Sequence, residues 1–162
     1  MTASSNTTLP VTVEGKKLLE EELKRLLSVD RPAVIQAIEE ARAHGDLKEN
    51  AEYAAAKEKQ SFIQGRVQYI TGVITGAQVI DPKSINYSHI VFGATVKMEE
   101  VDSGNSVTYK IVGVDEADIT KNKISIASPI ARALIGKKTG DEVQVKTPRG
   151  NVGYEICGVE YR

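Results

Sequence analysis

The feature that most constrains this chain is a change in the spacing of its apolar residues about halfway along it. From Val13 to about Gly76 they recur every three or four residues, which is typical of amphipathic helices. From Ile90 onward they alternate with polar residues, which is typical of strands with one buried face. The sequence therefore predicts an α+β protein in two parts, the first helical and the second built on a sheet.

The helical part is predicted to be an antiparallel coiled-coil hairpin, because only a few residues around His44 and Gly45 join its two periodic segments. Pro32 should kink the first helix or restart it, with Ser28 or Asp30 as the new N-terminal cap. We expect the apolar seam to use leucines at the base and alanines near the turn: Leu19, Leu23, Leu26, Ala33, Ala37 and Ala41, facing Ala51, Ala55, Phe62, Tyr69 and Val73.

The second part contains five alternating segments separated by turn sequences: Thr95–Glu99, Val107–Ile111, Lys123–Ile126, Val143–Lys146 and Tyr154–Tyr161. One short helix should be capped by Ser128, carry Pro129 in its first position and end at Gly136. Successive hairpins predict an antiparallel β-sheet with this short helix on one face. The expected divisions are a flexible N-terminal tail at 1–10, a hairpin at 11–78 with its tip at about 43–50, and a globular α+β domain at 79–162.

Composition excludes several classes of protein. The net charge is −1 and neither half is strongly basic, so nucleic acid would not be bound by bulk phosphate neutralisation. No apolar run is long enough to span a bilayer, so we expect no membrane partner. The single cysteine, Cys157, cannot form an internal disulfide, which fits the cytoplasm, and we expect it to be a small core residue. One cysteine and two histidines are too few and scattered for a zinc site.

The hairpin turn carries an unusual pair of acids, Asp46 and Glu49, three residues apart. Oxygen ligands of this kind suit Mg²⁺ or Mn²⁺. The same spacing is that of a capping box, with Asp46 capping the second helix and Glu49 reaching back. Spacing alone favours the cap, because caps are common and metal pairs rare. Asn50 offers an alternative cap that would free both acids, so the choice stays open at this point.

A wider resemblance bears on that choice. The chain resembles the Gre family of bacterial transcription elongation factors, which cleave transcripts with RNA polymerase, and it resembles the A-type more than the basic B-type. The similarity covers nearly all of the chain after the tail, in blocks at 45–53, 77–81, 92–96, 115–118 and 128–137. The family likeness implies that the second part has an FKBP-like fold.

The resemblance also implies a function. The globular domain would dock at the secondary channel of bacterial RNA polymerase, and the coiled coil would reach toward the active site. Asp46 and Glu49 would be ligands to a Mg²⁺ shared with the polymerase, so that the 3′ end of backtracked nascent RNA is cleaved and elongation resumes. The free protein would bind no cofactor tightly. We expect a monomeric, cytoplasmic accessory factor that is not itself an enzyme and has no small-molecule substrate.

The family likeness assigns further roles. Arg42 and Lys57 match positions that contact the extruded RNA, although many relatives have Arg at the latter and a solvated helix face would explain both. Ser128 and Pro129 lie in the segment that matches the polymerase-docking surface, besides starting the short helix. Tyr53 is expected to pack across the hairpin, and His44 to be solvated.

Two other functions compete with transcript cleavage. A channel-binding factor without cleavage would have the same shape and partner, and would inhibit or stabilise the polymerase. The FKBP-like fold also occurs in peptidyl-prolyl isomerases, but this half has no Trp and too few aromatic residues for a proline pocket, and fold does not carry function. We expect no isomerase activity.

Overall fold

The computed structural model describes residues 9–162, so positions 1–8 of the expected tail lie outside the described residues. The chain forms two compact units. One is the helical segment Lys16–Gly76, and the other joins residues 9–15 to Ala77–Arg162. The short segment before the hairpin, which the sequence assigned to the tail and the hairpin, thus belongs to the second unit.

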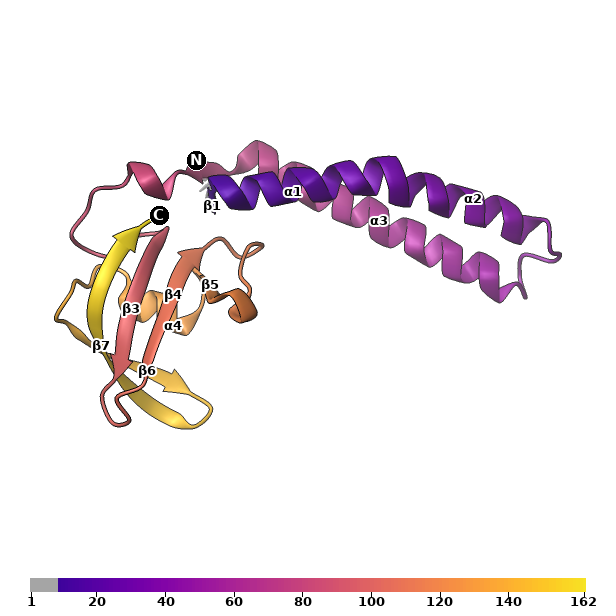
Figure 1. The fold of residues 1–162 in the computed structure, drawn as a ribbon. Coiled ribbons are helices and arrows are strands. Elements are labelled where there is room, and N and C mark those ends of the chain that lie inside the picture. Colours follow the sequence, from indigo (N-terminus) through magenta and orange to yellow (C-terminus); the bar gives the residue numbers. More distant parts are fainter. Residues whose placement is uncertain (1–8) are drawn as a thin grey trace, which may run out of the picture. The chain divides into compact units, whose positions relative to one another are not determined.

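The helical unit is a hairpin of two long, nearly antiparallel helical arms (Figure 1). The first arm comprises α1 (Val13–Arg25), a π-helical turn η1 (Leu26–Asp30) and α2 (Arg31–Arg42). The second arm is α3 (Ala51–Gly76). Gly65 and Gly72 lie within α3 without breaking it, and Gly76 is its last residue.

Pro32 does not restart the first arm with a new cap, which was one of the two outcomes expected from the sequence. Asp30 has helical dihedral angles and no side-chain capping bond, and the Ser28 hydroxyl donates to the Lys24 carbonyl at 2.6 Å. The backbone N–H of Arg31 bonds to the carbonyl of Leu26, five residues back. A proline ring clashes with the carbonyl four residues earlier and donates no hydrogen bond. The wider π turn gives that carbonyl room and keeps the arm helical.

The extra residue in the π turn shifts the apolar seam by one position. Leu19 and Leu26 are buried as expected, but the seam continues through Val34 and Ile38, whereas Ala33 and Ala37 are exposed. In α3 the predicted seam residues Phe62 and Tyr69 are exposed, at 71% and 43%, and the residue after each is buried instead, whereas Val73 is buried as predicted. The seam residues that are buried beyond the turn or in α3 are Val34, Ile38, Ala41, Ala56, Ile63, Ile70 and Val73.

An ion pair joins the two arms near the base of the hairpin. Arg66 of α3 donates from Nε and Nη2 to the two carboxylate oxygens of Glu22, at 2.7 and 2.8 Å. Both side chains are about 70% buried. These hydrogen bonds lower the pKa of the Glu22 carboxyl, against the opposing effect of burial. Such a two-pronged pair fixes the register of the arms as well as adding stability.

The second unit is built on a five-stranded sheet with the order β5-β4-β3-β7-β6 (Figure 1). Its strands are β3 (Ala94–Glu100), β4 (Ser106–Val112), β5 (Lys123–Ser125), β6 (Glu142–Thr147) and β7 (Gly150–Tyr161). All five segments predicted as strands are confirmed. The sheet is antiparallel except for β5, which pairs with β4 in the parallel direction because the 3-10 turn η3 (Ile119–Lys121) and the loop before it carry the chain back along the sheet.

One face of the sheet forms the core with α4 (Pro129–Leu134). As predicted, Ser128 caps this helix by accepting from the amide of Ala131 at 3.3 Å, and Pro129 takes its first position. Ala131 and Leu134 are fully buried with Val96, Met98 and other strand residues. The α+β class and the helix on one face are therefore confirmed.

Cys157 is exposed, so its prediction as a core residue is wrong. A β-bulge between β3 and β7 is the reason: Lys97 pairs with Gly158, but the next residue, Met98, pairs with Ile156. Cys157 is the extra residue and has no partner opposite it. Strict alternation fails at such a point, and Val159 and Tyr161 rather than their neighbours pack on the core beyond it.

Two short strands were not predicted. β1 (Pro10–Thr12) and β2 (Gln78–Ile80) pair in parallel, and the Asp81 side chain caps a following 3-10 turn η2 (Pro82–Ser84). Thr12 is buried, and its hydroxyl donates to the buried carboxylate of Glu116. Lys123 lies within 3.5 Å of Glu116 and 3.6 Å of Glu14. This polar network ties the N-terminal strand to the loop before β5.

None of the helices in the described range 9–162 is long and apolar enough to cross a membrane.

Candidate functional site

The tip of the hairpin is held by one residue, Asn50, which bonds to both arms. Its side-chain oxygen accepts from the amide of Tyr53 at 3.0 Å, so Asn50 is the N-cap of α3. Its side-chain nitrogen donates at 2.6 Å to the carbonyl of Ala41, in the last turn of α2, which also accepts from the amide of His44 at 3.2 Å. Gly45 makes the turn between them with φ +130°, which disfavours other residues.

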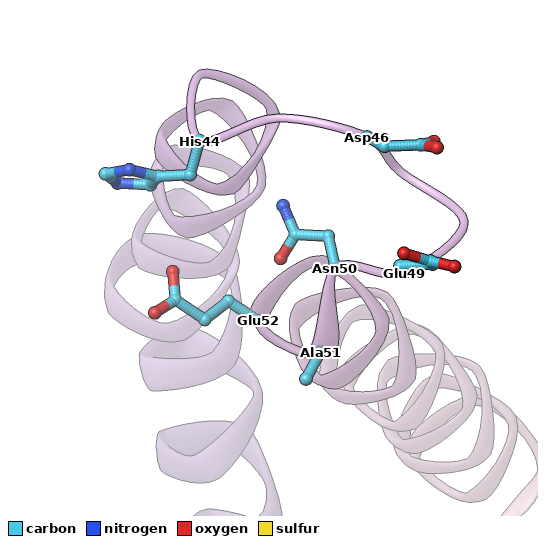
Figure 2. Close-up of a pocket in the computed structure, with 6 residues that line it drawn as sticks. All are labelled: His44, Asp46, Glu49, Asn50, Ala51 and Glu52. Carbon is cyan, nitrogen blue, oxygen red and sulfur yellow. The ribbon is translucent and has the colours of Figure 1, made fainter.

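Because Asn50 supplies the cap, Asp46 and Glu49 do not form the capping box that their spacing allowed. Asp46 accepts from the amide of Lys48 at 3.1 Å, a local turn bond that uses one carboxylate oxygen. No hydrogen bond or ion pair engages Glu49 within the described residues. Both side chains are exposed. Figure 2 shows the two carboxylates on the same side of the turn, pointing outward.

The tip has an open hollow lined mainly by polar residues of the hairpin loop and of the start of α3 (Figure 2). His44 and Glu52 lie on its other side from Asp46 and Glu49. No group of three or more His, Cys, Asp or Glu side chains in the described part of the chain is arranged to hold a metal. Two outward carboxylates fit an ion such as Mg²⁺, which takes one or two protein carboxylates and fills its remaining positions with water or another molecule's oxygens.

The predicted RNA-contact residues lie on the two arms behind the tip. The Arg42 guanidinium lies 5.9 Å from the centre of the Tyr53 ring, a cation–π contact between the arms, so Tyr53 does pack across the hairpin. Lys57 is exposed on α3, and its ammonium donates to Gln60 at 3.2 Å. Neither cation is paired with an acid in the described structure. Both therefore keep their charge available to a phosphate.

Ser128 and Pro129, predicted to lie at a docking surface, are in the other unit at the start of α4. The Ser128 hydroxyl donates to the carbonyl of Ser125 at 2.7 Å in addition to its capping bond. Their structural role in starting the helix is thus clear.

Comparison with known families matches both units. Residues 9–79 match the family model described as "Transcription elongation factor, N-terminal", and residues 85–161 match "Transcription elongation factor, GreA/GreB, C-term". The chain belongs to the GreA/GreB family of transcription elongation factors. The expectation drawn from the tip motif and the other blocks is confirmed.

Individual GreA proteins are similar over almost their whole length. The chain is 57% identical to the transcription elongation factor GreA of Alkalilimnicola ehrlichii, covering 94% of this chain and 98% of that protein. It is 58% identical to GreA of Halorhodospira halophila, with the same coverage of 94% and 98%. It is 57% identical to GreA of Legionella pneumophila, over 94% of this chain and 96% of that protein.

Solved structures of similar length include the GreA factor homolog 1 protein of Thermus thermophilus, at 24% identity, a TM-score of 0.43, and coverage of 94% of this chain and 99% of that one. The GreA/GreB factor of Nitrosomonas europaea has 22% identity, a TM-score of 0.42, and coverage of 95% and 100%. The assignment to the GreA/GreB family rests on the sequence matches.

The double role of Asn50 is what sequence reasoning missed at the tip of this GreA/GreB protein. Asn immediately before a helical segment is a strong cap signal, and it identified Asn50 as one of two candidates. The bond to Ala41 spans nine residues across the turn and has no local sequence pattern. Only the close approach of the two arms creates it.

Proposed function

We propose that this chain binds bacterial RNA polymerase and stimulates cleavage of the 3′ end of backtracked nascent RNA, so that arrested complexes resume elongation. Membership of the GreA/GreB family supports the partner. The observation that carries the proposal is the arrangement of Asp46 and Glu49, both free of any capping role and both directed outward from the same side of the hairpin tip.

In this proposal Asp46 and Glu49 are ligands to a Mg²⁺ that the polymerase active site also holds. When bound, the ion would activate a water or stabilise the leaving oxygen in phosphodiester hydrolysis. Glu49 offers both carboxylate oxygens, since nothing in the described structure engages it. Asp46 offers the oxygen that does not accept from Lys48. Asn50 keeps the two acids in place by fixing both ends of the turn.

The other residues predicted to be functional would contact the RNA or the polymerase. The coiled coil would enter the secondary channel, and Arg42 and Lys57 would contact phosphates of the extruded RNA. The unit containing Ser128 and Pro129 would dock on the polymerase. The protein would be an accessory factor, because two carboxylates on an exposed tip hold Mg²⁺ only weakly without ligands from a partner. We further propose that it acts as a monomer in the cytoplasm.

Adding the purified protein to a backtracked elongation complex with Mg²⁺ tests the proposal, with shortened RNA as the readout. Asp46→Asn keeps an oxygen that can accept from Lys48 but removes the charge, and Glu49→Gln does the same without touching a hydrogen bond. Each should slow cleavage roughly tenfold or more, since a loss of ~1.4 kcal/mol of transition-state stabilisation is tenfold in rate. Glu58→Gln, an exposed acid on α3, is the matched control.

Binding to the polymerase must be measured alongside cleavage. We expect all variants to compete equally for the polymerase. If Asp46→Asn and Glu49→Gln bound normally and cleaved as fast as the wild type, the acids would not be metal ligands. If the wild-type protein bound but gave no shortened RNA, it would be a channel binder without cleavage activity.

A further inference from the structure

The sheet of the second unit has a face that does not contribute to the core. On β3, Ala94, Val96 and Met98 are fully buried in the core, so the alternate residues Thr95 and Lys97 project from the opposite face. β3 is the central strand of the sheet, between β4 and β7 (Figure 1). Thr95 and Lys97 therefore lie in the middle of this outer face.

Thr95 is a polar residue of the outer face that is nevertheless buried, at 6% exposure. Its hydroxyl is closed off from solvent and has no hydrogen-bond partner in the described structure. A buried hydroxyl without a partner costs free energy, and native proteins rarely leave one unless a water, ion or ligand uses it.

The strand register surrounds this hydroxyl with cations. Thr95 pairs with Lys110 on β4, and Lys97 pairs with Thr108. Lys110 in turn pairs with Lys123 on β5. Neither Lys97 nor Lys110 forms an ion pair with a described residue. The acids nearby are paired with other cations. Glu116 and Glu14 both lie next to Lys123, and Glu160 lies 3.6 Å from Arg162.

Two open hollows of about 200 and 350 Å³ adjoin each other here and share Thr95, Thr108 and Arg162 as lining residues. Each is far larger than the roughly 15 Å³ that one water needs. The first also contains Lys97, Gly158 and Glu160, and the second Lys110, Lys121, Asn122 and Lys123. Gly158 has no side chain to fill the space next to Lys97. No aliphatic or aromatic side chain lines either hollow, so nothing there would hold an apolar peptide side chain.

We propose that this outer face of the sheet binds a phosphate group, free or esterified, between Thr95, Lys97 and Lys110. The two ammonium groups supply charge-assisted hydrogen bonds. The Thr95 hydroxyl, which is closed off from solvent in this structure, would donate to a phosphate oxygen after a local shift of its neighbours. Glu160 opposes an anion, but its pair with Arg162 is about two-thirds exposed and weak, so this carboxylate turns toward solvent at little cost.

The test is a titration of the full chain with inorganic phosphate, followed by the amide NMR signals of Thr95, Lys97 and Lys110, against potassium chloride at equal ionic strength. A parallel titration uses a single-stranded oligonucleotide without terminal phosphates. Lys97→Gln and Lys110→Gln should each weaken binding roughly tenfold, as expected for one charge-assisted hydrogen bond. Thr95→Val tests the hydroxyl at constant shape, and Lys146→Gln on β6 is the matched control.

Saturable shifts with inorganic phosphate that depend on Lys97 and Lys110 would establish a site for free phosphate. The same dependence with the oligonucleotide would establish a site for phosphodiesters. The proposal is overturned if neither ligand shifts these signals more than chloride does, or if Lys146→Gln weakens binding as much as Lys97→Gln. It is also overturned if Thr95→Val leaves phosphate binding unchanged, in which case a water satisfies the hydroxyl.

Discussion

The side-chain nitrogen of Asn50 lies 2.6 Å from the backbone oxygen of Ala41 and donates a hydrogen bond to it across the hairpin turn. The same side chain caps α3 through its oxygen. One amide thus satisfies an unpaired donor of α3 and adds a hydrogen bond to a carbonyl of α2, which also accepts from the amide of His44 at 3.2 Å. The conformation of the turn that carries Asp46 and Glu49 depends on it.

Asn50→Ala should destabilise the tip by about 1–2 kcal/mol, because it removes a helix cap and a partly buried side-chain donor. Amide hydrogen exchange at Tyr53 is the measurement, since that amide is the one the cap protects. Asn50→Ser is the control: its hydroxyl oxygen can still cap α3, but it has no amide nitrogen to donate to Ala41, so its effect should be smaller. Unchanged exchange in Asn50→Ala would show that the turn holds its shape without this residue.

The hairpin should be less stable in acid, because protonation of Glu22 removes the stabilising contribution of its pair with Arg66. Because Arg66 lowers the pKa of Glu22 in the folded state, the pair's contribution is fully present above the unfolded value of about 4.3 and is lost as the pH falls through the lower, folded pKa. Glu22→Gln should lower the free energy of unfolding of the hairpin by about 1 kcal/mol near neutral pH, a figure reduced to allow for the partial exposure of the pair. In strong acid it should have no effect.

Hydrogen exchange at Ile63 and Ile70, which are buried in the hairpin seam, reports this change. Glu20→Gln is the matched control, because Glu20 contacts Lys16 at 3.6 Å with both side chains well exposed. It should cost under about 0.5 kcal/mol. Equal effects of the two substitutions at neutral pH would mean that the Glu22–Arg66 geometry adds nothing.

Gly15→Ala should destabilise the unit that contains the sheet. A Cβ on Gly15 would lie 2.6 Å from Oε2 of Glu116 and 3.2 Å from Oγ1 of Thr12. Glu116 is 8% exposed and held by Thr12 and Lys123, so it cannot move aside freely. We expect a cost of about 1–3 kcal/mol, measured by hydrogen exchange at Met98 in the core.

Gly65→Ala on α3 is the contrasting case, because nothing lies within 4 Å of its added Cβ. Replacing an unconstrained helical glycine should stabilise the hairpin by roughly 0.5–1 kcal/mol. A neutral Gly15→Ala variant would show that Glu116 can leave its bond to Thr12 without cost.

Lys57→Arg should increase transcript cleavage if Lys57 contacts a phosphate of the extruded RNA. A guanidinium binds a phosphate through two parallel hydrogen bonds, where an ammonium acts as a point charge. We expect a rise of roughly two- to tenfold at limiting protein concentration, measured in the cleavage assay. Lys59→Arg, also exposed on α3, should change nothing. Equal responses of the two variants would remove Lys57 from the RNA contact.

The elements of this fold could be predicted from local pattern alone. Alternation located all five strands of the main sheet, and the Ser128-Pro129 pair located the start of α4. The parallel pairing of β5, and that of β1 with β2, depends on contacts between distant segments and has no local signal. Cys157 shows the limit of alternation, since a single bulge residue reverses the faces on either side of it.

The candidate site was also predictable only as far as local sequence pattern determines it. The residues of the tip were found by their order in the sequence, but whether Asp46 or Asn50 caps α3 depends on which oxygen reaches the Tyr53 amide. In the first arm the seam was assigned wrongly just beyond the π turn, at Ala33 and Ala37, because periodic counting assumes an unbroken α-helix, whereas Ala41 is buried as predicted.

The π turn at Leu26–Asp30 therefore sets the rotation of the first arm's outer half as well as accommodating Pro32. One α-helical residue corresponds to about 100° around the helix axis. Every residue of α2 thus occupies the face that its predecessor would have in a regular helix. Cross-links, probes or grafted motifs placed on α2 by heptad counting from Leu19 would point about a quarter-turn away from their intended neighbours.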